Sequence, residues 1–450
     1  MSTHSPSPAE TQNRAEPWNR PITKRTIVHV SIICFVAWVI SVYDYTLFGT
    51  LLPVIAEDFG WNTADIAAIN TYVTIGVFIV SLIVGTILDK LGRKRALILL
   101  VLGGALASGL TGLAAGLGSM IVIRAFTGLS ISEEVVNAVY LSEMYRKVKK
   151  KGLVYALVQG GYPIGALLAA AISAAFLPVI GWRGSFVLAG VLGLVVVLLA
   201  FTLPESPTFA AIREVKRRRE AGDDAGAAAL AAEHELDLDA NSTGGLREVF
   251  GPQHRGHTIS LALAWFASWM AIQVFSVLGT TVLVAAKGVS FDNALFILIL
   301  ANAVGFCGYV FHGWIGDKIS RRLTVILGWT LGGIVSFIML IGPGEAWFIF
   351  PMYALTLFFL NGPFAALLYY GGESFPAHVR GVGNNVAHVM APVGGIAGSG
   401  LLAILLSAGA SMIVAAAIAG SLALILGGVC MSFTRKVDQR TAAEKAEVAA

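Results

Sequence analysis

The stretch that decides the fold is GTILDKLGRK at residues 85–94, and a near copy, GWIGDKISRR, stands at residues 313–322. Each stretch closes an apolar run, places an acid four residues after a glycine, and ends in a basic pair. The copy lies 228 positions after the original. One match of this kind is weak evidence, so its value depends on whether other marks repeat at the same offset.

Two further marks do repeat at nearly that offset. PIG at residues 163–165 returns as PVG at 392–394, shifted by 229 positions, and YLSE at 140–143 returns as YGGE at 370–373, shifted by 230. Three matches in the same order predict a duplicated domain. Internal repeats of apolar helices are typical of membrane transporters that expose one site alternately to the two sides of a bilayer.

The composition places most of the chain in lipid. Of its 450 residues, 56% are hydrophobic and 13% are charged, whereas a soluble domain carries about 25% charged residues. The net charge of +4 is spread over short connections, so it does not indicate a nucleic-acid partner. We expect an all-α membrane protein whose spans each approach the roughly 20 residues that a bilayer requires. The twelve expected spans are residues 27–50, 66–88, 96–117, 119–142, 153–177, 184–204, 258–284, 291–313, 322–342, 347–371, 380–405 and 410–433.

The positions of the 31 Lys and Arg residues predict the topology. Given these spans, 28 of them fall in the two tails and the even-numbered connections, Arg183 and Lys287 fall on the other side, and Arg124 lies inside a span. Lys and Arg gather in the cytoplasmic loops of membrane proteins. Both termini are therefore expected in the cytoplasm, and the expected location is a plasma membrane, in the simplest case a bacterial inner membrane.

The expected organisation is two six-helix bundles flanked by tails and joined by a linker. The N-terminal tail covers residues 1–26, the first bundle 27–204, the cytoplasmic linker loop 205–257, the second bundle 258–433 and the C-terminal tail 434–450. The linker contains a stretch rich in Ala, Glu and Asp, so a short helical segment is expected in it.

No motif in the chain predicts bond-making chemistry. It has no P-loop, no zinc-ligand helix and no nucleophile elbow, and Cys34, Cys307 and Cys430 lie in separate spans. We expect no enzyme activity, no cofactor and no metal. Without an ATP site, the energy for transport would come from an ion gradient or from the substrate's own gradient. The expected partners are a small substrate, protons and the lipid bilayer, for a chain that acts as a monomer.

Four charged residues lie inside the expected spans, where a charge costs at least roughly 2.5–3.5 kcal/mol. They are Asp44 in the first span and Arg124, Glu133 and Glu134 in the fourth. Glu133 and Glu134 are expected on different helix faces, and two adjacent carboxylates cannot easily both stay ionised in a low dielectric. All four are candidates for proton coupling. The alternative is that the acids and Arg124 only neutralise one another.

Polar and aromatic residues in the spans are candidates for substrate contact, because residues of these types line small-molecule cavities. The candidates are Arg124, Asn137, Gln159, Trp269, Gln273, Asn361, Tyr369 and Asn385. Tryptophan also faces lipid headgroups in membrane proteins, so that alternative stays open for Trp269. His388, eight residues into the eleventh span, is either part of the cavity or solvated near the cytoplasmic mouth.

The repeated stretches resemble the loop signature G-x-x-x-D-x-x-G-R-R/K of the major facilitator superfamily, with Ser320 in place of the second-copy glycine. The resemblance implies a fold of two pseudo-symmetric six-helix bundles. It also implies a breakable charge latch between helix ends on the cytoplasmic side. The expected gate residues are Asp89, Arg93, Glu143, Asp317, Arg321, Glu373 and Arg380.

Three further patterns resemble the metabolite:proton symporters of that superfamily. Arg124 and Gly128 are similar to the R-x-x-x-G motif linked there to proton coupling, and residues 132–143 resemble G-G-E…Y-x-x-E with Glu134 as the acid. Tyr43-Asp44 resembles the D-G-Y-D pattern of aromatic-acid:proton symporters, although Ser41 replaces the first acid. The resemblance implies proton-coupled uptake of a small organic anion, such as an aromatic or short-chain carboxylate, by alternating access.

Two alternatives stay open. GWR at residues 181–183 and LPESP at 203–207 also match the wider sugar and organic-ion porter group, so a sugar or polyol symporter or facilitator is the first. A membrane sensor with a transporter-like fold is the second. A sensor is expected to carry a long signalling tail, and only 18 residues follow Ser432.

Overall fold

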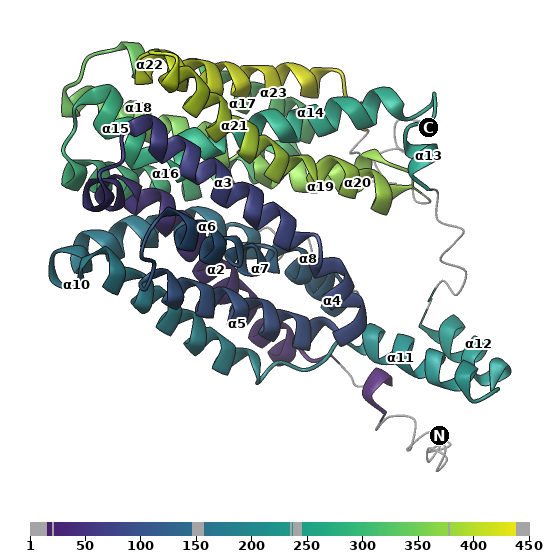
Figure 1. Cartoon of the computed structure of the whole chain (residues 1–450). Coiled ribbons are helices and arrows are strands. Elements are labelled where there is room, and N and C mark those ends of the chain that lie inside the picture. Colours follow the sequence, from purple (N-terminus) through teal and green to yellow (C-terminus); the bar gives the residue numbers. More distant parts are fainter. Residues whose placement is uncertain are drawn as a thin grey trace.

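A computed structural model describes most of the chain as helices and short turns. No strand occurs among the described residues. The helices up to α10, purple to teal in Figure 1, form one group, and the green to yellow helices from α14 onward form a second group beside it. The described residues are 16–19, 22–145, 157–234, 236, 245–376 and 379–437, and the side chains of Asp89 and Arg380 lie outside this description.

The described helices of the N-terminal group account for six of the expected spans. Its helices are α2 (Lys24–Phe59), α3 (Thr63–Ser81) continued by α4 (Val84–Leu91), α5 (Arg93–Thr111), the broken run α6 (Leu117–Ala125), α7 (Thr127–Ile131) and α8 (Glu133–Met144), and α10 (Gly161–Ala200). The chain reverses inside α10 at Gly181, whose φ of 64° favours glycine. Thr202 accordingly bonds His29 near the start of α2, while Arg183 pairs with Asp58 near its end.

The C-terminal group repeats this arrangement. Its helices are α14 (Arg255–Ile272) continued through the π-helical turn η3 (Gln273–Val277) into α15 (Gly279–Lys287), α16 (Phe291–Lys318), α17 (Arg321–Ile341), α18 (Ala346–Asn361) with α19 (Phe364–Ser374), α20 (Arg380–His388) with α21 (Met390–Ser407), and α22 (Met412–Ala416) with η4 (Ala417–Leu422) and α23 (Ala423–Ser432). Within the described residues, ten helical runs are long and apolar enough to cross a membrane. Counting α10 as two crossings and α6–α8 as a further one gives the twelve that the sequence predicts.

One expected span is clearly too short. The sequence predicts the first span at residues 27–50, whereas α2 is 36 residues long and continues to Phe59. The reason is burial: Leu51, Leu52 and Ile55 are fully buried, so the helix continues to pack beyond the length that a bilayer alone requires.

The repeated sequence marks make equivalent contacts in the two groups. A side chain at Gly165 would overlap the backbone carbonyl of Val39, and one at Gly394 would overlap that of Phe266. These glycines therefore allow α10 to lie close against α2 and α21 to lie close against α14. The duplication predicted from sequence thus extends to helix packing.

The first and last described membrane helices begin and end, respectively, at one end of the molecule, which we call the terminal end. It holds the start of α2 and the end of α23, and the opposite end is the far end (Figure 1). The segment between the two groups also lies there and contains α11 (Pro207–Glu220), α12 (Asp224–Glu233) and α13 (Leu246–Val249). Trp18 packs onto a small apolar cluster of α11 and α12 formed by Val215, Ala227, Leu230 and Ala231.

The two groups touch through uncharged polar contacts toward the far end. Thr280 of α15 donates to the carbonyl oxygens of Gly49 (3.3 Å) and Thr50 (2.9 Å) of α2. Tyr45 of α2 donates to Gln273 of η3 at 3.3 Å. These contacts join α2 of one group to η3 and α15 of the other.

Candidate functional site

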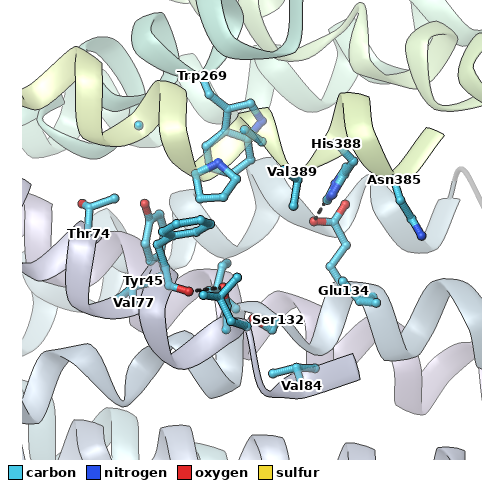
Figure 2. Close-up of a pocket in the computed structure, with 18 residues that line it drawn as sticks. Tyr45, Thr74, Val77, Val84, Ser132, Glu134, Trp269, Asn385, His388 and Val389 are labelled. Carbon is cyan, nitrogen blue, oxygen red and sulfur yellow. Dashed lines mark hydrogen bonds and ion pairs between the residues drawn. The ribbon is translucent and has the colours of Figure 1, made fainter. Parts of the chain in front are cut away.

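Two adjoining cavities lie between the groups. The larger, which we call the cleft, has a volume of about 350 Å³, within the range of small-molecule sites. It is lined by Tyr45, Thr74, Val77, Phe78, Ser81, Leu82, Val84, Ile131, Ser132, Glu134, Val135, Trp269, Asn385, His388, Val389, Ala391, Pro392 and Gly395. Figure 2 shows this cleft with Glu134 and His388 facing each other across it.

The smaller cavity, which we call the aromatic chamber, has a volume of about 30 Å³. Six of its eleven lining residues are aromatic. They are Trp38, Tyr162, Trp265, Trp269, Tyr309 and Phe364, and the others are Glu134, Gln159, Ile272, Asn361 and Leu368. Because Glu134 and Trp269 line both cavities, the chamber adjoins the cleft at these two residues.

Helix breaks surround these cavities. The break between α3 and α4 places Leu82 and Val84 on the cleft, the break between α7 and α8 places Ser132 there, and the break between α20 and α21 places Val389 there. Irregular backbone at membrane depth occurs where it lines a cavity rather than lipid. The breaks therefore support a functional cavity between the groups.

Glu133 and Glu134 lie on different sides of α8, as the sequence predicts. Glu134 lines both cavities, and its carboxylate lies 3.9 Å from Nε2 of His388 on α20. Glu133 is fully buried and lines neither cavity. The proximity of His388 to Glu134 joins the two groups and is not predicted by the sequence.

Asp44 and Arg124 form a buried ion pair away from both cavities. Nη1 of Arg124 lies 2.9 Å from the Asp44 carboxylate, and Nη2 donates to the Asp44 carbonyl oxygen at 3.0 Å. Ser108 also donates to the carboxylate. The guanidinium lies over the rings of Phe48 and Phe186. Arg124 thus pairs with Asp44, one of the three acids that the charge-neutralising alternative assigns to it, and neither residue lines a cavity.

The other substrate candidates divide into two sets. Gln159, Trp269, Asn361 and Asn385 line a cavity.

The remaining candidates do not reach either cavity. Asn137 donates to the carbonyl oxygen of Cys34 at 3.1 Å. Gln273 accepts from Tyr45, and the ring of Tyr369 lies under the Arg321 guanidinium.

Several lining residues were missed from sequence. Trp38 of α2, Tyr162 and Tyr309 line the chamber, and Tyr45 of α2 lines the cleft. Trp38 and Tyr45 are seven residues apart, close to two helical turns, so they share a face. That spacing is a signal that could have identified them.

Three buried donors in the chamber have no hydrogen-bond partner within the described part of the chain. They are the indole N–H groups of Trp265 and Trp269 and the amide of Asn361. Buried polar groups in native structures are almost always hydrogen-bonded, so these donors are available to an acceptor that enters the chamber. Indole and amide N–H groups favour an acceptor such as a carboxylate oxygen.

Ion pairs hold the helix ends at the terminal end. Arg93 at the start of α5 makes a two-point pair with Glu143 of α8, with Nε–Oε2 and Nη2–Oε1 distances of 3.0 and 2.6 Å. Arg321 at the start of α17 pairs with Asp317 at 2.8 Å and also with Glu373 of α19. Asp89 and Arg380, the other expected gate residues, have side chains outside the described part of the structure.

The ion pairs of the two groups differ in their additional hydrogen bonds and in their exposure to solvent. Glu205, which follows α10, accepts from the backbone N–H groups of Arg93 and Lys94 at 3.0 and 3.2 Å. Ser206 donates to Glu143. The Glu143 side chain is 12% exposed, whereas Glu373 is 43% exposed. The N-terminal pair is therefore tied to the linker, and the C-terminal pair is open to solvent.

Comparisons with known proteins agree with this geometry. The family model described as Major Facilitator Superfamily matches residues 34–399. The chain is 24% identical to the 4-hydroxybenzoate transporter PcaK of Pseudomonas aeruginosa, over 84% of this chain and 86% of that protein. It is 26% identical to a gallate transporter of Pseudomonas putida, with 70% and 71% coverage. It is 22% identical to the niacin transporter NiaP of Acinetobacter baylyi, with 84% and 87% coverage.

A solved structure shares the fold. The inward-open xylose transporter XylE from E. coli superposes with a TM-score of 0.70 at 15% identity, covering 94% of this chain and 99% of that one. At this identity the likeness concerns the fold alone.

Proposed function

The chain belongs to the major facilitator superfamily and is a multi-pass membrane transporter rather than an enzyme, and from this premise we propose proton-coupled uptake of a small organic acid anion. The proposed substrate is an aromatic or short-chain carboxylate, carried by alternating access of the cavities between the two groups. The observation that carries the proposal is the set of three unpartnered donors in a chamber lined by aromatic rings. Relatives that transport 4-hydroxybenzoate, gallate and niacin support the same class.

The sizes of the cavities fit such a substrate. The chamber, at about 30 Å³, has room for one small polar group, and the cleft, at about 350 Å³, has room for an aromatic ring. A carboxylate placed in the chamber would accept from the indole N–H groups of Trp265 and Trp269 and from Asn361. Desolvated aromatic faces around it would favour a ring over a polyol, whose hydroxyl groups need many acceptors.

Glu134 supplies a physical reason for proton coupling. It lines both cavities, so an anionic substrate would lie near its carboxylate. Two like charges in a poorly solvated site repel, and a proton on Glu134 removes the repulsion. Proton and anion would therefore bind more tightly together than alone, and the effect of each on the other is reciprocal. Asp44, held by Arg124, serves this proposal as a structural group.

The membrane orientation, the location and the oligomeric state are part of the proposal. We place the terminal end in the cytoplasm, because it carries most of the basic residues, with the linker at residues 205–257 and both tails on that side. The helix-end ion pairs would then be cytoplasmic gate contacts. The proposed location is a bacterial inner membrane, and the proposed oligomeric state is a monomer.

Uptake in proteoliposomes tests the substrate class. Purified protein is offered 4-hydroxybenzoate, gallate, nicotinate, acetate, xylose and a polyol, each with and without an imposed inward proton gradient. Accumulation of an aromatic carboxylate above its equilibrium level, and only with the gradient, is expected. Accumulation of xylose or the polyol instead would replace the proposal by sugar symport, and equal entry with and without the gradient would leave a facilitator.

Glu134→Gln tests the coupling. This variant is expected to lose uphill accumulation at least about tenfold while keeping counterflow exchange, which needs no net proton movement. Glu57→Gln is the matched control, since Glu57 is exposed near the end of α2 and lines no cavity. Normal gradient-driven accumulation by Glu134→Gln would show that the proton binds elsewhere.

A further inference from the structure

Glu134 and His388 belong to different halves of the molecule but meet in one cavity. Glu134 lies in the first turn of α8, and His388 is the last residue of α20. Their closest atoms, Oε2 and Nε2, are 3.9 Å apart, and Figure 2 shows them facing each other across the cleft. A small side-chain rotation or one bridging water would place a proton between them.

The surroundings of the pair hold few other titratable groups in the described part of the chain. Glu133 lies next to Glu134 on α8, Tyr162 of α10 and Tyr309 of α16 line the chamber with Glu134, and Tyr45 of α2 lines the same cleft. None of these four is a cation at neutral pH. His388 is therefore the group from the C-terminal half that can stabilise a Glu134 carboxylate by charge.

His388 also contacts the proposed substrate chamber. Its ring packs edge-on against Trp265, with ring centroids 4.7 Å apart. Trp265 lines the chamber with an unpartnered indole N–H. A ligand bound to that N–H would fix the Trp265 ring and, through it, the position of the imidazole.

We propose that Glu134 and His388 form a single proton site that exists only while the two halves meet at this position, which makes His388 a second residue of the proton site. This inference rests on the proposed function and adds a second residue to its proton step. One proton from water binds the pair and cancels its net negative charge, as a protonated Glu134 carboxyl beside a neutral imidazole or as a carboxylate beside an imidazolium. When the halves part, His388 moves away with α20, and the proton returns to water. Only N–H and O–H bonds form or break.

This arrangement meets the thermodynamic condition for coupling. A proton gradient drives transport only if the two access states bind the proton with different affinities. A site divided between two rigid bodies satisfies that condition, because rocking of the halves changes the distance between its two parts. A carboxyl with all its partners on one half would keep nearly the same surroundings in both states.

A double-mutant cycle in proteoliposomes tests the inference with 4-hydroxybenzoate as the probe. Wild type, Glu134→Gln, His388→Gln and the double variant are compared for gradient-driven accumulation and for counterflow exchange. Each single variant is expected to lose about tenfold or more in accumulation but less than about threefold in exchange. The double variant is expected to match the more impaired single variant, since residues that act as one unit are not additive.

Two outcomes would overturn the inference. One is normal accumulation by His388→Gln, and the other is a double variant whose loss is the product of the two single losses. His29→Gln is the matched control, because His29 is exposed near the start of α2 and bonds Thr202, far from the cleft. This control is expected to keep the wild-type response to the gradient.

A substrate-free measurement separates this inference from the proposed function. Infrared titration of purified protein follows the carboxyl band that disappears in Glu134→Gln. His388→Gln is expected to move the midpoint of that band by at least about one pH unit, because the nearby imidazole is removed. An unmoved midpoint would overturn the pair even if the aromatic acids are transported, and a moved midpoint would support it even if they are not.

Discussion

Tyr140 and Tyr370 make the same hydrogen bond in the two halves of the molecule. Tyr140 donates its hydroxyl to the carbonyl oxygen of Pro204, just after α10, and Tyr370 donates to that of Arg435, just after α23. Each tyrosine therefore ties the fourth helix of its half to the segment that leaves the sixth. The two copies of Y-x-x-E therefore make the same contacts. The glutamate of each copy, Glu143 or Glu373, also pairs with the arginine of the repeated loop in its own half.

Removing these hydroxyl groups should lower stability without altering the cavities. Tyr140→Phe and Tyr370→Phe are each expected to cost about 1 kcal/mol, the net value of a buried hydrogen bond. Thermal unfolding in detergent measures the loss. Tyr72→Phe is the control, because Tyr72 is 52% exposed. Equal melting temperatures for all three variants would contradict this role of the tyrosines.

The Asp44–Arg124 pair should matter for folding more than for energy coupling. Breaking a buried ion pair leaves an uncompensated charge and costs about 3–5 kcal/mol. Asp44→Asn is therefore expected to reduce the melting temperature and the yield of folded protein, whereas Glu134→Gln is expected to keep both. If Asp44→Asn folds normally but loses uphill accumulation, Asp44 carries protons and the structural interpretation is wrong.

The indole donors of the chamber should set the affinity for a carboxylate. Trp265→Phe and Trp269→Phe keep an aromatic ring but remove the N–H group. Each is expected to raise the substrate concentration that gives half-maximal exchange about five- to tenfold, equivalent to a loss of about 1–1.5 kcal/mol in binding free energy. Trp314→Phe is the control, since Trp314 is 57% exposed and lines neither cavity. An unchanged half-saturation in both chamber variants would remove the donors from the substrate site.

The two helix-end ion pairs should respond differently to salt. Arg93–Glu143 is nearly buried, whereas Glu373 and Asp317 beside Arg321 are well exposed. Exposed pairs are worth about 0–1 kcal/mol and are screened by salt. Glu143→Gln is expected to lower the melting temperature at both low and high salt. Glu373→Gln is expected to lower it only slightly, and only at low salt. A larger loss for Glu373→Gln than for Glu143→Gln at high salt would show that the C-terminal pair contributes more to stability.

Acid should loosen the linker hairpin of α11 and α12. Hydrogen bonds from Arg217 and Arg218 lower the pKa of Glu214 to about 2, below its ordinary value. A carboxyl with a depressed pKa stabilises the fold above its unfolded pKa and loses this effect as pH falls toward 2. Hydrogen exchange of α11 is expected to lose protection between about pH 4 and pH 2. Glu214→Gln should lack that acid step, and Glu220→Gln, with Glu220 exposed, should retain it.

The sequence predicts the architecture well because its signals are local. Hydrophobic length gives the crossings, basic residues give the expected sidedness, and helical periodicity separates Glu133 from Glu134. The contacts between the two halves cannot be obtained in this way. Periodicity shows that Glu134 faces away from Glu133, but it does not show that His388 of α20 faces Glu134.

The same limit explains why some candidate residues lie outside both cavities. Arg124 suits an anionic substrate in charge and shape, yet its guanidinium is occupied by Asp44 and enclosed by Phe48 and Phe186. Competition among partners for one buried cation depends on packing across α2, α5 and α10, which no local pattern encodes. Trp38 and Tyr45 were missed because single aromatic residues are common in spans.

The attachment of Glu205 and Ser206 to α5 and Glu143 makes the hairpin of α11 and α12 an extension of one half only. Any rocking of that half would carry the hairpin with it, and the displacement would grow with distance from the pivot. A fluorophore on α12 and a second on the terminal end of α17 would thus report the conformational cycle as a change in energy transfer. The hairpin of α11 and α12 is thus a natural labelling site for following single transport cycles in real time.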